Sequence, residues 1–180
     1  MMSAQDPRNK FKTSDYDQQE QELPGLQSKM TPQPDCGETS YKGHERLKGY
    51  KMLVTGGDSA IGRAAAIAYA KEGADVAINY LPSEEEDAQE VKQVIEDAGQ
   101  KGILIPGDLR DEQFNYDMVE TAYNELGGLD NVTLVAGHQQ YHDDIHGFNT
   151  EAFAETFETN VYPVFWTVQK ALEYLKPGSS

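Results

Sequence analysis

The sequence predicts an α/β protein built on a doubly wound parallel sheet, with an irregular arm before it. From Lys51 onward, short apolar runs alternate four times with longer amphipathic stretches. This alternation is typical of strands joined by helices that cover both faces of a parallel sheet. A glycine-rich segment follows the first apolar run, and residues 1–45 lack a sustained apolar period. Right-handed crossovers then favour a Rossmann-like topology over the other arrangements.

The individual elements follow from the spacing of the apolar residues. Strands are expected at 51–55, 75–80, 102–106 and 131–136. Helices are expected at 61–72, 84–98, 111–126 and 150–175. Gly73 and Gly99 follow two of these helices as C-terminal stops. Pro163 lies inside the last helix and should kink or fray it.

Residues 1–45 are expected to form a polar arm, and residues 46–180 a separate folded domain. The arm is rich in Gln, Asp, Glu, Lys and Pro, so it cannot bury enough apolar surface to offset its ordering entropy. It is therefore either disordered or an extended segment that wraps a neighbouring subunit. The anchors in the second case are Tyr16, Leu23, Leu26, Met30 and Tyr41. Both alternatives stay open at this point.

Composition excludes several classes of partner. The chain has 15 basic and 31 acidic side chains and a formal charge of −16. Nucleic acids and anionic membranes would be repelled by this charge. The first residues are polar, unlike a signal peptide, and no apolar run approaches the roughly 20 residues that cross a bilayer. A single cysteine, Cys36, rules out an internal disulfide framework, so we expect a cytoplasmic protein.

The segment between the first strand and the first helix reads TGGDSAIG over residues 55–62. Gly56 permits a tight turn, a small residue at 60 lets the backbone approach a pyrophosphate, and Gly62 lets the helix pack close to the strand. The N–H groups and dipole at the start of a helix favour an anion. We therefore interpret 46–180 as a dinucleotide-binding domain, with purely structural glycines as the alternative.

Further segments occur in the order found in a known family. Residues 55–62 resemble the cofactor loop of the classical short-chain dehydrogenase/reductase family. Residues 79–82, 107–109, 136–137 and 159–161 resemble further segments of that family and occur in the same order. The loop sequence, the run after the second strand and the polar arm resemble a bacterial subgroup described as glucose/ribitol-dehydrogenase-like or aldehyde-reductase-like. The resemblance implies an NAD(P)-dependent oxidoreductase that interconverts an alcohol and an aldehyde or ketone by hydride transfer. It also implies a small-molecule carbonyl or alcohol substrate and a homo-oligomer, a tetramer at full length.

The resemblance implies roles for single residues as well. The implied cofactor-binding residues are Gly56, Ser59, Ala60, Ile61, Gly62, Asn79, Tyr80, Asp108, Leu109, Ala136 and Gly137. Those from the glycine-rich segment would line the pyrophosphate and nicotinamide ribose, those at 108–109 would cradle the adenine, and those at 136–137 would pass close to the ribose. Asn160 would be the asparagine of the catalytic proton relay. The alternatives are a helix N-cap for Asp108 and an ordinary helical polar residue for Asn160.

The choice between NAD and NADP depends on the residue that ends the second strand. An acidic side chain there binds the ribose hydroxyls of NAD and repels the phosphate of NADP. This chain has Tyr80 at that position, so no carboxylate is present to exclude the phosphate of NADP. Neither residue 59 nor residue 81 is an arginine that could hold this phosphate, so NAD is not excluded either. The sequence therefore favours NADP, or use of both cofactors.

Three departures from the family pattern matter. Ala60 replaces the usual glycine, so we expect a modest loss of cofactor affinity. Leu134 and Val135 replace paired asparagines that brace the sheet. None of the ten tyrosines has a lysine four positions later, so the family's catalytic Ser, Tyr and Lys are not matched. The chain as written is therefore expected to be inactive alone and to leave its fourth strand as an exposed edge.

A histidine run and an acidic run have competing interpretations. His138, His142 and His146 recur every fourth residue, and on a helix they would share a face that could bind a metal. Gly137 and Gly147 bracket them like a loop, so no metal site is predicted. The acidic run at 84–87 is interpreted as favourable charge at a helix start. A noncatalytic dinucleotide-binding or assembly protein remains the alternative to an enzyme.

Overall fold

The computed structural model describes residues 18–180, so the expected anchor Tyr16 lies outside the described residues. Four parallel strands form one sheet in the order β3-β2-β1-β4. Their bounds are Lys51–Thr55 for β1, Asp75–Tyr80 for β2, Gly102–Pro106 for β3 and Asn131–Leu134 for β4. The strand order reverses between β1 and β4, which is where a doubly wound sheet opens its binding crevice.

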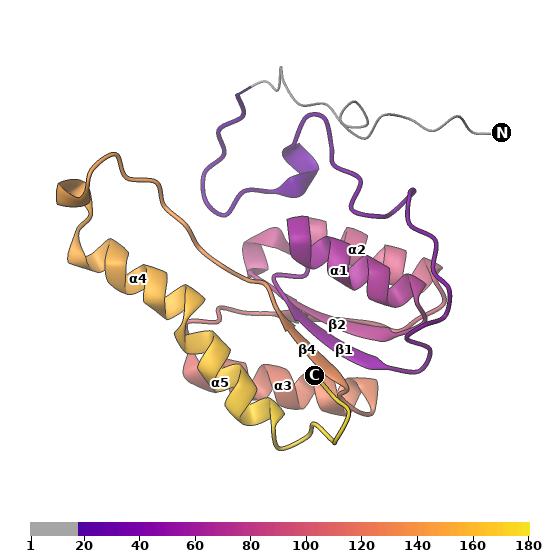
Figure 1. Cartoon of the computed structure of the whole chain (residues 1–180). Coiled ribbons are helices and arrows are strands. Elements are labelled where there is room, and N and C mark those ends of the chain that lie inside the picture. The colour runs from indigo at the N-terminus through magenta and orange to yellow at the C-terminus, as the bar shows by residue number, and fades with distance from the viewer. Residues whose placement is uncertain (1–17) are drawn as a thin grey trace.

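The helices cover both faces of this sheet. Their bounds are Ala60–Lys71 for α1, Glu85–Asp97 for α2, Glu112–Leu126 for α3, Thr150–Asn160 for α4 and Tyr162–Ala171 for α5. In Figure 1, α1 and α2 lie on one face, and α3 and α5 lie on the other. The predicted α/β, doubly wound fold is confirmed.

The core consists of two apolar layers, one on each face of the sheet. Met52 and Val54 of β1 belong to the layer under α1 and α2, whereas Leu53 belongs to the layer under α3. Successive side chains of a strand point to opposite faces. The strand is apolar at every one of these positions because both of its faces are buried.

The helix predicted at 150–175 is two helices. Val161 separates them, with φ of −118° and ψ of −54°, and Pro163 lies in the first turn of α5. The break expected from Pro163 is confirmed, because proline cannot donate the backbone hydrogen bond that a continuous helix needs. Within α5, the rings of Tyr162 and Trp166 pack with centroids 5.7 Å apart.

Strand β4 is shorter than predicted. The hydroxyl of Thr55 accepts hydrogen bonds from the backbone N–H groups of Val135 (3.0 Å) and Ala136 (3.3 Å), which takes these residues out of the ladder. As expected, β4 is an edge strand. Its outer side is partly paired, because Ser180 exchanges backbone hydrogen bonds with Asp130 and Val132.

The described part of the arm lies against α1 and α2 of its own chain (Figure 1). The Nζ of Lys71 in α1 donates to the carbonyls of Gly37, Glu38 and Tyr41 at 2.7, 2.6 and 3.2 Å. The next residue, Glu72, is buried and accepts hydrogen bonds from Arg46 and Tyr41. Neither of the two alternatives for the arm anticipated this contact within the chain. In the part of the chain that the structure describes, no helix is long and apolar enough to cross a membrane.

Candidate cofactor-binding site

A cleft of about 560 Å³ opens at the carboxyl ends of the strands. It is lined by the loops that follow all four strands, as expected for ligand binding at the switch point of a doubly wound sheet. All the predicted cofactor-binding residues line it except Gly62. The structure therefore brings together Gly56 and Gly137, which lie 81 positions apart in the sequence.

Two glycines give the first loop its shape. Gly56 has φ of +60°, in the left-handed region that favours glycine. A Cβ at Gly62 would lie 1.9 Å from the carbonyl oxygen of Gly56, so only glycine permits this approach of α1 to β1. Gly62 thus acts beneath the cleft, by packing. The loop leaves Ile61 74% exposed at the start of α1. A backbone cradle at a helix N-terminus fits the diphosphate bridge of a dinucleotide.

Ala60 departs from the expected glycine, and its backbone shows the consequence. Its φ is +44°, a conformation that costs an L-residue about 1–2 kcal/mol. Its N–H group donates to the side-chain oxygen of Gln27 in the arm at 2.6 Å. The arm therefore binds the first turn of α1 at Ala60, the residue whose backbone is strained.

Asn79 and Tyr80 border the cleft, but their side chains are turned into the protein. The Asn79 amide is 2% exposed and donates to the carbonyls of Ile105 (3.2 Å) and Gly107 (3.1 Å). The Tyr80 ring is buried in the core, and its hydroxyl donates to Glu85 at 2.5 Å. Burial and this carboxylate raise the pKa of Tyr80. Both residues thus fix the loops after β2 and β3 that form the cleft wall.

Asp108 faces the cleft, and its carboxylate is held by Arg110. The Arg110 Nε and Nη2 atoms donate to it at 2.9 and 2.6 Å, and this hydrogen bonding lowers the pKa of Asp108. The alternative of a helix N-cap is wrong, because Asp111 caps α3 by accepting from the N–H of Phe114. Leu109 is buried beneath the same loop and also lines the cleft.

Asn160 lies at the end of α4, next to a second cavity of about 570 Å³. Its Oδ1 accepts from the N–H of His138, and its Nδ2 donates to the carbonyl of His138, both at 2.7 Å. The two cavities share residues 135–138, which include Ala136 and Gly137. Asn160 therefore ties the helix break to the loop that divides the cleft from its neighbour, and its catalytic role stays a prediction.

Sequence reasoning missed two acidic residues that line the cleft, Asp58 and Glu84. Asp58 is 2% exposed, its Oδ2 has no hydrogen-bond partner among residues 18–180, and burial raises its pKa. Burial and the nearby Asp58 charge raise the pKa of Glu84 to about 7. Glu84 accepts the N–H of Leu81 at 3.1 Å and so caps the 3₁₀ turn Pro82–Glu84 that precedes α2, which agrees with the helix-start interpretation; its place in the cleft was not predicted. The sequence signal that could have identified Asp58 is its position inside the glycine-rich loop.

The histidine run does not form a helical face. Residues 137–144 are irregular, and only Ile145–Gly147 forms a 3₁₀ turn. Within residues 18–180, no group of three or more His, Cys, Asp or Glu side chains is arranged to hold a metal ion.

Comparisons with known proteins identify relatives of this chain. The chain is similar to uncharacterized oxidoreductase YghA of Escherichia coli (strain K12), with 55% identity over 180 residues, 100% of this chain and 61% of that protein. It is also similar to NADPH-dependent aldehyde reductase 1, chloroplastic, of Arabidopsis thaliana, with 32% identity over 168 residues, 91% of this chain and 58% of that protein. The chain thus spans less than two thirds of the length of these relatives.

A solved short-chain dehydrogenase from Burkholderia cenocepacia J2315, in complex with NADP, has the same fold. The match has 36% identity and a TM-score of 0.69, and it covers 74% of this chain and 54% of that one. The sequence profile described as short chain dehydrogenase matches residues 51–180. Because this match covers residues 51–180, which include β1 to β4 and α1 to α5, the chain belongs to the short-chain dehydrogenase family.

Proposed function

We propose that this chain is the cofactor-binding part of an NAD(P)-dependent oxidoreductase that interconverts an alcohol and an aldehyde or ketone. The observation that carries the proposal is the close approach of Gly62 to Gly56, which brings the start of α1 to the cleft as a backbone cradle. The bound nicotinamide would supply or accept the hydride. The residues of this chain would bind the diphosphate, orient the coenzyme and shape its surroundings.

The second cavity supports a place for the substrate. It adjoins the cleft along residues 135–138, so a small carbonyl or alcohol there would lie beside the coenzyme. We propose that Asn160 acts at this boundary. The chain lacks a tyrosine with lysine four positions later, so we propose that it does not turn over substrate by itself.

For the coenzyme, we propose NADP, or use of both NADP and NAD. The end of β2 presents Tyr80, whose side chain is buried, in place of the exposed carboxylate that selects NAD. The Burkholderia relative was solved with NADP, and the Arabidopsis relative is named for NADPH. Both support the proposal.

We also propose a homo-oligomer, assembled through α4 and α5. These helices and the residues beside them expose large apolar side chains in the monomer: Phe153, Phe157, Val161, Tyr162, Val164, Phe165, Val168 and Leu172. An apolar surface of this kind marks an interaction site in many proteins. A second copy of the chain, covering it, would explain its composition.

Titration calorimetry of the folded chain with NADP(H) and NAD(H) tests the proposed function. We expect binding of at least one of the four, and Ile61→Glu should weaken it at least about tenfold because a carboxylate then faces the diphosphate. Ile61→Gln, matched in size, is the control. Ala60→Gly should tighten binding a few-fold, because glycine adopts the backbone conformation at this position without strain. Absence of heat with every coenzyme would disprove the proposed site.

A further inference from the structure

The N-terminal arm reaches the cofactor cleft. Leu23, Pro24 and Gly25 line the cleft together with the loops of the sheet. These residues precede the sheet domain by some twenty-five positions and belong to the segment that the sequence left as disordered or extended. The arm therefore supplies a part of the cleft wall that residues 51–180 do not form.

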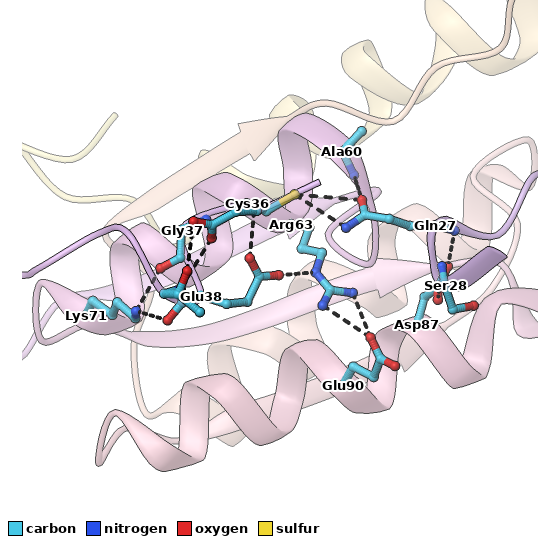
Figure 2. A network of polar contacts seen from close by, with 12 residues as sticks. Gln27, Ser28, Cys36, Gly37, Glu38, Ala60, Arg63, Lys71, Asp87 and Glu90 are labelled. Carbon is cyan, nitrogen blue, oxygen red and sulfur yellow. Dashed lines mark hydrogen bonds and ion pairs between the residues drawn. The ribbon is translucent and has the colours of Figure 1, made fainter. Parts of the chain in front are cut away.

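A buried carboxylate holds this part of the arm in place. Asp87 of α2 is fully buried, and its Oδ2 and Oδ1 accept the backbone N–H groups of Gln27 (2.6 Å) and Ser28 (3.1 Å). Figure 2 shows the two residues lying directly over Asp87. A charged acceptor makes stronger hydrogen bonds than a neutral one. Asp87 also lies in the first turn of α2, where an acidic side chain favours the helix dipole, but its full burial and its two hydrogen bonds to the arm go beyond that role.

The side chain of Gln27 joins the arm to the glycine-rich loop. It is buried, and its Oε1 accepts the N–H of Ala60 at 2.6 Å (Figure 2). Farther along, Arg63 of α1 binds Glu38 of the arm at 2.7 Å and Glu90 of α2 at 3.1 Å. The arm is thus fixed to the first turns of both α1 and α2.

We propose that residues 23–28 are part of the coenzyme site and close its adenosine end, with Asp87 and Gln27 as positioning residues. This inference rests on the proposed function. Helix α2 starts just after β2, and the end of β2 is where a doubly wound fold holds the adenosine ribose. A segment seated on α1 and α2 together therefore stands over that end of the cleft. Its fixed position lowers the ordering cost of binding.

The first experiment measures affinity in the full chain. Asp87→Asn leaves one acceptor where two N–H groups donate, and Gln27→Ala removes the acceptor for Ala60. Each should raise the dissociation constant of the coenzyme at least about fivefold. ADP, which carries the adenosine and diphosphate alone, should lose the same factor. The control is Glu86→Gln: beside Asp87, it removes an exposed charge that makes no hydrogen bond or ion pair with residues 18–45 of the arm. Circular dichroism checks that each variant is folded. If Asp87→Asn does not fold, Gln27→Ala still tests the proposal, because it changes a residue of the arm and none of residues 51–180.

The second experiment uses thermodynamic reciprocity. If the docked arm strengthens coenzyme binding, bound coenzyme must stabilise the docked arm by the same factor. Trypsin cleavage after the exposed Lys29, followed by mass spectrometry, should therefore slow at least about fivefold in saturating coenzyme. A purely structural arm would show no such protection.

The outcomes separate the two proposals. A wild-type chain that binds neither coenzyme nor ADP overturns the proposed function. A wild-type chain that binds, with unchanged affinity in both variants and unchanged cleavage after Lys29, overturns the role of the arm and leaves the proposed function standing. Weaker binding in both variants together with protection at Lys29 supports the arm as part of the site.

Discussion

At the scale of single residues, the notable feature of the cleft is a pair of carboxyl groups that form no ion pair with a lysine or arginine of the described residues. Asp58 and Glu84 both line it. Arg63, the nearest arginine in sequence to the glycine-rich loop, is engaged by Glu38 and Glu90. Among the lining residues in the described part of the chain, Arg110 is the one arginine or lysine, and it pairs with Asp108. A phosphate on the adenosine ribose would therefore meet carboxyl groups, whose protonation decides whether they repel it.

This arrangement predicts pH-dependent selection between coenzymes. The pKa of Glu84 is raised to about 7, because burial and the charges of Asp58 and Asp87 favour its neutral form. Below that pH the neutral carboxyl tolerates the phosphate of NADP, and above it the charged form repels the phosphate. The affinity for NADP relative to NAD should fall between pH 6 and pH 8, by at most about tenfold per pH unit for one proton.

Calorimetric titrations with both coenzymes at several pH values measure this ratio. Glu84→Gln should flatten the profile, because the amide keeps the size of the side chain and does not titrate. Glu86→Gln, an exposed neighbour, should leave the profile as in the wild type. An equally steep profile in Glu84→Gln would assign the effect to another group.

At the scale of elements, the side chain of Asn160 links the break between α4 and α5 to the loop that follows β4. Asn160 makes two hydrogen bonds of 2.7 Å to the backbone of His138, just after β4. Asn160→Ala removes both, and each is worth about 0.5–1.5 kcal/mol. We expect the free energy of unfolding to fall by about 2 kcal/mol, measured by urea denaturation.

Asn124→Ala, at an exposed position of α3, is the control and should change stability by less than about 0.5 kcal/mol. If Asn160→Ala behaved like this control, the junction would be held by the packing of the helices alone.

The sequence predicted the elements well where local signals agree. Every strand begins at the predicted residue, and the ends of α1, α2 and α3 differ from the prediction by at most one residue. The exceptions depend on distant partners. The end of β4 is set by the hydroxyl of Thr55, some eighty residues earlier. The position of the arm is set by Asp87 and Lys71, which no period in residues 1–45 reveals. The cleft residues were predicted from order along the chain, whereas Asp58 and Glu84 gained importance only from burial.

At the scale of the whole molecule, two properties oppose each other. A formal charge of −16 disfavours contact between copies, and the apolar side chains of α4 and α5 favour it. Salt screens the first and not the second. Association should therefore strengthen as ionic strength rises, which is the opposite of a contact built on ion pairs.

Sedimentation equilibrium at about 0.15 M and at about 1 M salt tests this balance, because association should be stronger at the higher concentration. Phe165 of α5 is 64% exposed and belongs to the apolar surface, and Phe165→Glu should weaken self-association at least about tenfold. Tyr141→Glu changes an even more exposed aromatic residue in the loop before α4 and should have little effect. A wild-type chain that stays monomeric at every concentration would contradict the proposed oligomer.

The pairing of Trp166 with Tyr162 has a practical consequence. The chain contains a single tryptophan, so its emission spectrum reports on one place, the helix that carries the apolar side chains. Covering that helix would remove water from around the indole and move the emission to shorter wavelength. Unlabelled protein thus contains its own optical sensor for the assembly state, read by dilution in a fluorimeter.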